Sequence, residues 1–151
     1  MKAQKNAKPH SKDLRKGRFS APNQIYSVTI NIEDRIPVFK DFNAARGLIN
    51  IMRNEQTLGR ANTLAFVVMP DHLHWLLQLT GQMSLSKVLQ SVKGLSAKKV
   101  GRPIWQEGYH DRAVRREEDL QSIARYIVAN PLRAGLVKKI GEYPHWDAIW
   151  L

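Results

Sequence analysis

Hydrophobic and polar positions alternate with the two-residue period of a β-strand near the start of the chain and again at its middle. Residues 24–32 alternate and are rich in β-branched side chains, which is typical of a strand. Residues 64–69 form a continuous apolar run, which is typical of a central strand. A Pro-Asp turn then leads into residues 72–79, so these two segments are predicted to pair as a hairpin. A short last strand is predicted at residues 113–115.

Three other segments carry the 3.6-residue apolar period of amphipathic helices. The first is capped by Asp41 or Asn43 and the second by Ser84, and they run to about residues 58 and 100. The third follows acidic residues that complement the dipole of its first turn. Its apolar stripe comprises Leu120, Ile123, Ala124 and Ile127.

The order of these elements is strand, helix, strand, strand, helix, strand, and then a C-terminal helix. This order predicts an α+β fold of the ferredoxin-like split βαβ type, an antiparallel sheet with helices on one face. The C-terminal helix carries Tyr126. The other face of the sheet is expected to be open to a ligand.

The amino-acid composition predicts where the folded domain begins and which class of partner the protein binds. Residues 1–18 are basic and almost without apolar side chains, so they are predicted to form a flexible tail before a single domain at 19–151. The formal charge of +11 favours polyanionic partners through phosphate contacts. The absence of cysteine excludes disulfides and thiolate metal sites. With no membrane-length apolar run and no secretory signal, we expect a cytoplasmic protein.

Candidate chemistry lies in two separate segments. His72 and His74 fall on the same side of the predicted strand, and two convergent imidazoles make half of a divalent-metal site. The alternative is a pair of ordinary histidines at a strand end. Downstream, Tyr126 and Asn130 are one helical turn apart, so a phenol and a hard amide oxygen ligand share one helix face. The alternatives are a core aromatic at Tyr126 and an N-cap at Asn130, because Pro131 favours the start of a new helix.

Four local motifs resemble the HUH-type single-tyrosine transposases, that is, the IS200/IS605 group and, more closely, the REP-associated tyrosine transposases. The resemblance runs from about Gly17 to the end of the chain. IS200/IS605 enzymes have glutamine where this chain has Asn130, whereas the REP-associated branch has asparagine. The four motifs are Met69–His74, Trp105–Arg112, Tyr126–Val137 and Tyr143–Trp146.

The resemblance implies metal-dependent nicking and strand transfer of single-stranded DNA at REP-like hairpins. Tyr126 would be the nucleophile that forms a 5′-phosphotyrosine, and His72, His74 and Asn130 would hold Mg²⁺ or Mn²⁺. The protein would act near the bacterial nucleoid, as a monomer rather than a homodimer. The alternatives are a non-catalytic hairpin-binding module that serves as a regulator, and a metal or small-molecule binder without nucleic acid.

Basic residues supply the predicted nucleic-acid contacts, although each of them taken singly is also compatible with solvated surface charge. In the tail, the alternative is a solubilising extension. His110 and Asp111, which lie in one of the shared motifs, are predicted at the rim of the active site. The predicted contacts are Arg15, Lys16, Arg18, Lys87, Lys93, Lys98, Arg112, Arg115 and Arg116.

Overall fold

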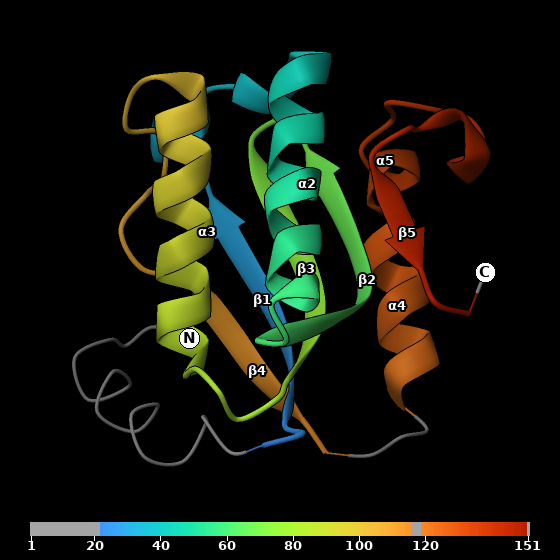
Figure 1. Cartoon of the computed structure of the whole chain (residues 1–151). Helices are drawn as coiled ribbons and strands as arrows, with labels where there is room; N and C mark the ends of the chain where they lie inside the picture. The colour runs from blue at the N-terminus through green and yellow to red at the C-terminus, as the bar shows by residue number, and fades with distance from the viewer. Residues whose placement is uncertain (1–21, 116–118, 151) are drawn as a thin grey trace.

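A five-stranded antiparallel sheet forms the centre of the protein, with strand order β4-β1-β3-β2-β5 (Figure 1). The computed structural model describes residues 22–115 and 119–150. The first four strands have the order of a ferredoxin-like split βαβ fold, so the predicted fold class is confirmed. The strands are β1 (Ile25–Asn31), β2 (Ala61–Met69), β3 (His72–Leu79), β4 (His110–Val114) and β5 (Trp146–Ala148).

Helices α2 (Phe42–Thr57) and α3 (Leu85–Val100) lie side by side over one face of the sheet, as predicted (Figure 1). Each begins at a predicted cap. The carboxylate of Asp41 accepts hydrogen bonds from the Asn43 and Ala44 amides, and the Ser84 hydroxyl accepts one from the Lys87 amide. Short 3₁₀ helices, η1 (Glu33–Arg35) and η2 (Val38–Lys40), link β1 to α2.

The core under α2 and α3 is mostly apolar on the sheet side, and the Thr63 hydroxyl accepts a hydrogen bond there from the Trp75 indole. On β3 it takes Leu73, Trp75 and Leu77, while His72 and His74 lie on the opposite face. The predicted alternation along this strand is therefore confirmed. The side chains that meet in this core include Tyr26, Val28, Ile30, Leu48, Met52, Val88, Leu89 and Val92.

The opposite face carries α4 (Leu120–Val128) and the single-turn helix α5 (Asn130–Arg133). The apolar stripe of α4 packs against β2 and β3, so the face that was expected to be open is partly covered by the tyrosine-bearing helix. This packing brings that helix to the side of the sheet that carries the histidines. The packed residues are Ala65, Val67, Met69, Leu76, Leu120, Ala124, Ile127 and Val128.

Several boundaries differ from the expectation. Strand β2 starts at Ala61 rather than at residue 64, because its polar first residues pair with β3 through a register shift between Thr63 and Ala65. Strand β4 starts at His110 rather than at residue 113. The C-terminal residues add η4 (Ile140–Glu142) and β5, which pairs with β2 and was not predicted. Within the described part of the chain, no helix is long and apolar enough to cross a membrane.

Candidate active site

The histidine pair lies on β3 with its two rings in contact. The ring centroids of His72 and His74 are 4.7 Å apart and the ring planes are nearly perpendicular, at 89°. In the sheet register, Thr29 of β1 lies opposite His74, and Asn31 lies opposite His72. Thr29 and Asn31 of β1 are therefore the cross-strand neighbours of the two histidines.

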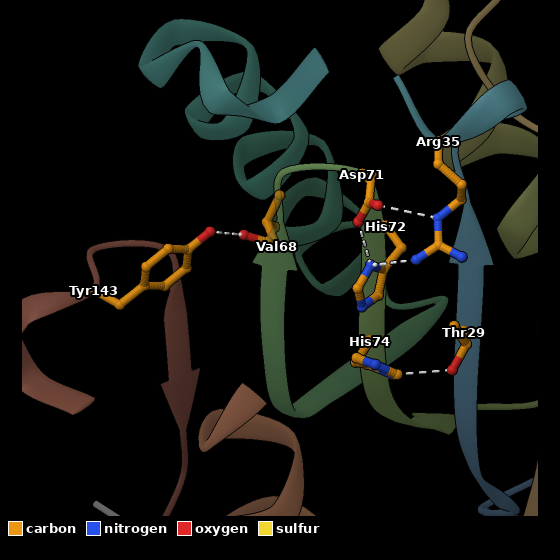
Figure 2. A network of polar contacts seen from close by, with 7 residues as sticks. All are labelled: Thr29, Arg35, Val68, Asp71, His72, His74 and Tyr143. Carbon is orange, nitrogen blue, oxygen red and sulfur yellow. Dashed lines mark hydrogen bonds and ion pairs between the residues drawn. The ribbon is translucent and has the colours of Figure 1, made fainter. Parts of the chain in front are cut away.

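Each imidazole has a hydrogen-bond partner at Nδ1 (Figure 2). The Nδ1 atom of His72 is 2.7 Å from Oδ1 of Asp71, and Nδ1 of His74 is 2.9 Å from the Thr29 hydroxyl. A carboxylate only accepts, so the Nδ1–H of His72 donates to it and the lone pair lies on Nε2. Carboxylate support of this kind is typical of histidines that bind metal through the other nitrogen.

Arg35 holds the Asp71 carboxylate from the other side. Its Nε donates to Oδ2 of Asp71 at 3.1 Å, and its Nη2 is 3.4 Å from Nδ1 of His72. Asp34 and Arg35 have positive φ values of 57° and 54°, a strained backbone that costs roughly 1–3 kcal/mol per residue. This strained turn places the guanidinium beside the histidine pair.

Burial keeps both imidazoles neutral near pH 7. Burial, together with the charges of His72, Arg133 and Arg35, lowers the pKa of His74 to about 3. Burial also lowers the pKa of His72, although Asp71 acts in the opposite direction. Burial raises the pKa of Asp71, but hydrogen bonds and charges from His72 and Arg35 outweigh it, and the net pKa is lowered. The imidazole lone pairs are therefore available without loss of a proton.

Tyr126 lies on α4 outside the apolar stripe, and 65% of it is exposed. The alternative of a core aromatic is therefore wrong. The guanidinium carbon of Arg133, in α5, lies 3.7 Å from the centroid of the Tyr126 ring. Sequence analysis did not single out Arg133, although its position seven residues after Tyr126 and three after Asn130 puts all three on one helical face.

Asn130 is the first residue of α5, and Ala129 is the N-cap, so the N-cap alternative is also wrong. Pro131 has no N–H to donate to the carbonyl of Ile127, four residues before it. The Asn130 side chain fills this gap, since its Nδ2 donates to that carbonyl at 3.3 Å. This bond uses an N–H of the amide and leaves the amide oxygen as an acceptor.

No group of three or more His, Cys, Asp and Glu residues suited to a metal ion lies within residues 22–115 and 119–150. A metal site here would therefore need the predicted amide in addition to His72 and His74. The donor set fits a divalent cation, because two neutral imidazole nitrogens and an amide oxygen are accepted metal ligands.

The predicted rim residues lie on opposite faces of the sheet. On the edge strand β4, His110 pairs with Thr29 and Arg112 with Ser27, which puts both on the face of the histidine pair. Asp111 pairs with Val28, whose side chain lies in the core under α2 and α3. Only His110 of the two therefore shares a face with the site.

The lysines predicted as nucleic-acid contacts lie on α3, across the sheet from the histidines. Lys87 and Lys98 are exposed. Lys93 instead donates from Nζ to the carbonyls of Gln106 and Gly108, at 3.0 and 2.9 Å, and burial lowers its pKa. Arg115 is exposed just after β4. The remaining predicted contacts, Arg15, Lys16, Arg18 and Arg116, lie outside the described residues.

The split βαβ sheet thus carries the histidine pair on the face against which the tyrosine-bearing helix packs. Residues 20–130 match the family model described as "Transposase IS200 like", and the chain belongs to this family. The resemblance found in the sequence is therefore confirmed.

Known relatives agree with this assignment. Over 82 residues the chain is 30% identical to the REP-associated tyrosine transposase of Escherichia coli (strain K12), a match that covers 53% of this chain and 50% of that protein. The chain thus spans about half the length of this curated relative.

Two solved structures share the fold. A REP-associated tyrosine transposase bound to a REP hairpin superposes with a TM-score of 0.72 at 24% identity, over 85% of this chain and 79% of that one. A crystal structure of a Deinococcus radiodurans R1 protein assigned as a transposase has a TM-score of 0.53 at 27% identity, over 74% and 94% of the two chains.

Proposed function

We propose that the protein cuts and rejoins single-stranded DNA at hairpin sequences through a covalent bond to Tyr126. The observation that carries the proposal is an exposed tyrosine on a helix packed against the sheet face that carries His72 and His74. Membership of the IS200-like transposase family supports the same reaction class.

In the proposed step, the phenol oxygen of Tyr126 attacks the phosphorus of a phosphodiester. The new O–P bond replaces the bond from phosphorus to the 3′-oxygen, and the phenol proton passes, directly or through water, to that leaving oxygen. One ester is exchanged for another, so the step is reversible without an energy-supplying cofactor. The cut 5′ end stays bound to the protein until a 3′-hydroxyl reverses the step.

His72, His74 and Asn130 would hold a Mg²⁺ or Mn²⁺ ion. When bound, this ion supplies Lewis-acid neutralisation of charge on the non-bridging phosphate oxygens. The protein's own part is to keep the two imidazoles neutral and fixed, through Asp71 and Thr29, and to hold the Asn130 amide by its bond to the Ile127 carbonyl.

The proposed substrate is a DNA hairpin of the REP type with single-stranded flanks. The formal charge of +11 supports a nucleic-acid substrate. One structural relative is described as bound to a REP hairpin, and the curated relative is named REP-associated. Monomeric action stays a prediction.

The test is a denaturing gel of the protein after incubation with labelled hairpin oligonucleotides and Mn²⁺ or Mg²⁺. Wild type is expected to form a covalent protein–DNA adduct. Tyr126→Phe, His72→Ala and added chelator are each expected to remove it. Tyr109→Phe is the matched control, because it removes another phenol hydroxyl, one that is hydrogen-bonded to Ser86 on the α3 side of the sheet.

Two other results would contradict the proposal. If wild type and Tyr126→Phe bind the hairpin equally and no adduct forms, the protein is a hairpin-binding module. If the protein binds no DNA hairpin at all, both the enzyme and the hairpin-binding hypotheses fail, and the hypothesis of a metal or small-molecule binder replaces them.

A further inference from the structure

Three polar side chains form one stripe along α4 and α5. Ala129, between the two helices, keeps a right-handed helical backbone with φ −83° and ψ 0°, so the helical path is nearly continuous. Tyr126, Asn130 and Arg133 are at positions i, i+4 and i+7 of this path and therefore face the same way. The stripe thus adds a guanidinium to the proposed nucleophile and the proposed amide ligand.

Arg133 contacts the tyrosine and carries a charge that acts on the histidine pair. Its guanidinium carbon is 3.7 Å from the Tyr126 ring centroid, and its charge reaches the His74 imidazole. Both Tyr126 and Arg133 are exposed. Of the carboxylates that the structure describes, none forms an ion pair with Arg133. This positive charge is thus held against an aromatic ring, and no acid among the described residues is paired with it.

We propose that Arg133 binds the DNA phosphate on which Tyr126 acts, and that the Tyr126 ring is the platform that orients the guanidinium. This inference rests on the function proposed above. A planar guanidinium can stack on a ring by its face and still donate from its edge to two phosphate oxygens, which a lysine ammonium cannot do. The same contact would fix the ring of the nucleophile relative to the phosphorus.

Arg125 provides a matched control on the same helix. It is exposed, as Arg133 is, and its Nη2 donates to Gln121 Oε1 at 3.2 Å, one turn back along α4. Replacing either arginine with alanine removes one positive charge from the same region of the protein. A difference between the two variants therefore reports the position of the charge and not its amount.

The first experiment measures binding in the Tyr126→Phe protein, which keeps the ring but has no hydroxyl to react. A labelled hairpin oligonucleotide with single-stranded flanks is titrated without metal. We expect the added Arg133→Ala change to weaken binding about tenfold and to lower the salt dependence by about one ion. Arg125→Ala should lower affinity less than threefold, and Arg133→Lys should recover part of the affinity.

The second experiment locates the contact. Oligonucleotides with one neutral methylphosphonate, placed in turn along the flanking strand, replace the charged phosphate at a single position. The penalty of Arg133→Ala should vanish at one position and persist at the others. In wild-type protein that position should be the site of cleavage.

Equal penalties for Arg133→Ala and Arg125→Ala, or a penalty for Arg133→Ala that persists with every methylphosphonate, would overturn the proposal. These binding measurements need no cleavage. If Arg133 shows its localised penalty but wild type forms no adduct, the phosphate contact stands and the proposed strand cleavage fails. If wild type forms the adduct and Arg133→Ala shows no binding penalty, the proposed strand cleavage stands and the proposed phosphate contact of Arg133 fails.

Discussion

Under α2 and α3 the sheet buries mostly apolar side chains, and Trp75 at its centre is fully inaccessible to solvent. On the opposite face, next to α4, the same strand presents His72 and His74, which are only partly buried and carry polar partners. Because side chains alternate along a strand, neighbouring residues of β3 belong to different faces. We infer that the face under α2 and α3 contributes to stability alone, that the other face also carries the proposed chemistry, and that neighbouring residues of β3 can change the two separately.

The largest expected effect is on activity, from His74→Leu. Leucine fills similar space but loses the hydrogen bond to Thr29 and the ring contact with His72, so the free energy of unfolding should fall by only about 1 kcal/mol. The covalent adduct with hairpin DNA should be lost, because a proposed metal ligand is gone. Urea unfolding and the denaturing gel measure the two effects. If the His74→Leu protein still forms the adduct, the hypothesis that the histidine face carries the reaction is wrong.

Trp75→Ala, one residue further along β3, should act in the opposite way. Removing this fully buried indole and its bond to the Thr63 hydroxyl should lower the free energy of unfolding by about 3–5 kcal/mol. The protein that stays folded at low temperature should still form the adduct. Urea unfolding measures the loss, and a destabilisation below about 1 kcal/mol would contradict the role given to the apolar face.

Asp71→Asn tests the support of the histidine pair, with a smaller expected effect. An amide cannot hold His72 as a carboxylate does, so affinity for Mn²⁺ should fall about 10–100-fold. Isothermal titration with Mn²⁺ measures it. Asp34→Asn is the control, since it removes a nearby carboxylate and asparagine tolerates its positive φ. Equal affinities in the two variants would show that Asp71 does not support the site.

The smallest expected effect is that of Tyr143→Phe, near the far edge of the histidine face. The hydroxyl donates to the Val68 carbonyl at 2.6 Å (Figure 2), so its loss should cost about 1 kcal/mol at neutral pH. Burial raises the pKa of Tyr143 to about 12, whereas an unfolded tyrosine ionises near 10. The folded protein therefore binds this proton more tightly than the unfolded chain does.

The advantage of wild type over Tyr143→Phe should be complete below pH 10 and should be lost as the pH rises towards 12. Urea unfolding at several alkaline pH values measures this trend. An advantage that stays constant or grows across that range would contradict it.

The sequence was sufficient where a feature depends on neighbouring residues. Alternation along residues 72–79 placed both histidines on one face, and the cap candidates, Asp41 or Asn43 and then Ser84, marked the starts of α2 and α3. The apolar stripe of α4 was predicted in the same way. The same alternation places the adjacent residues His110 and Asp111 on opposite faces of β4.

The rest depends on contacts between distant segments. Strand β5 has only three residues, and its pairing with β2 stabilises it, so no local pattern marks it. The docking of α4 onto the histidine face, and the inward turn of Lys93 towards two carbonyls, likewise appear only when the chain is folded. Arg35 reaches Asp71 because Asp34 and Arg35 have positive φ angles, and no local sequence pattern predicts these angles.

The interruption between α4 and α5 has a consequence for residue exchange. Asn130 closes the gap left by Pro131 with a side chain of one particular length, since its amide must reach back to the carbonyl of Ile127. Glutamine has the same functional group on a longer side chain, so it could keep the amide chemistry and still lose this hydrogen bond to the carbonyl. The residue at 130 and the imino acid at 131 are therefore a coupled pair, and any transplant of one between related enzymes should carry the other with it.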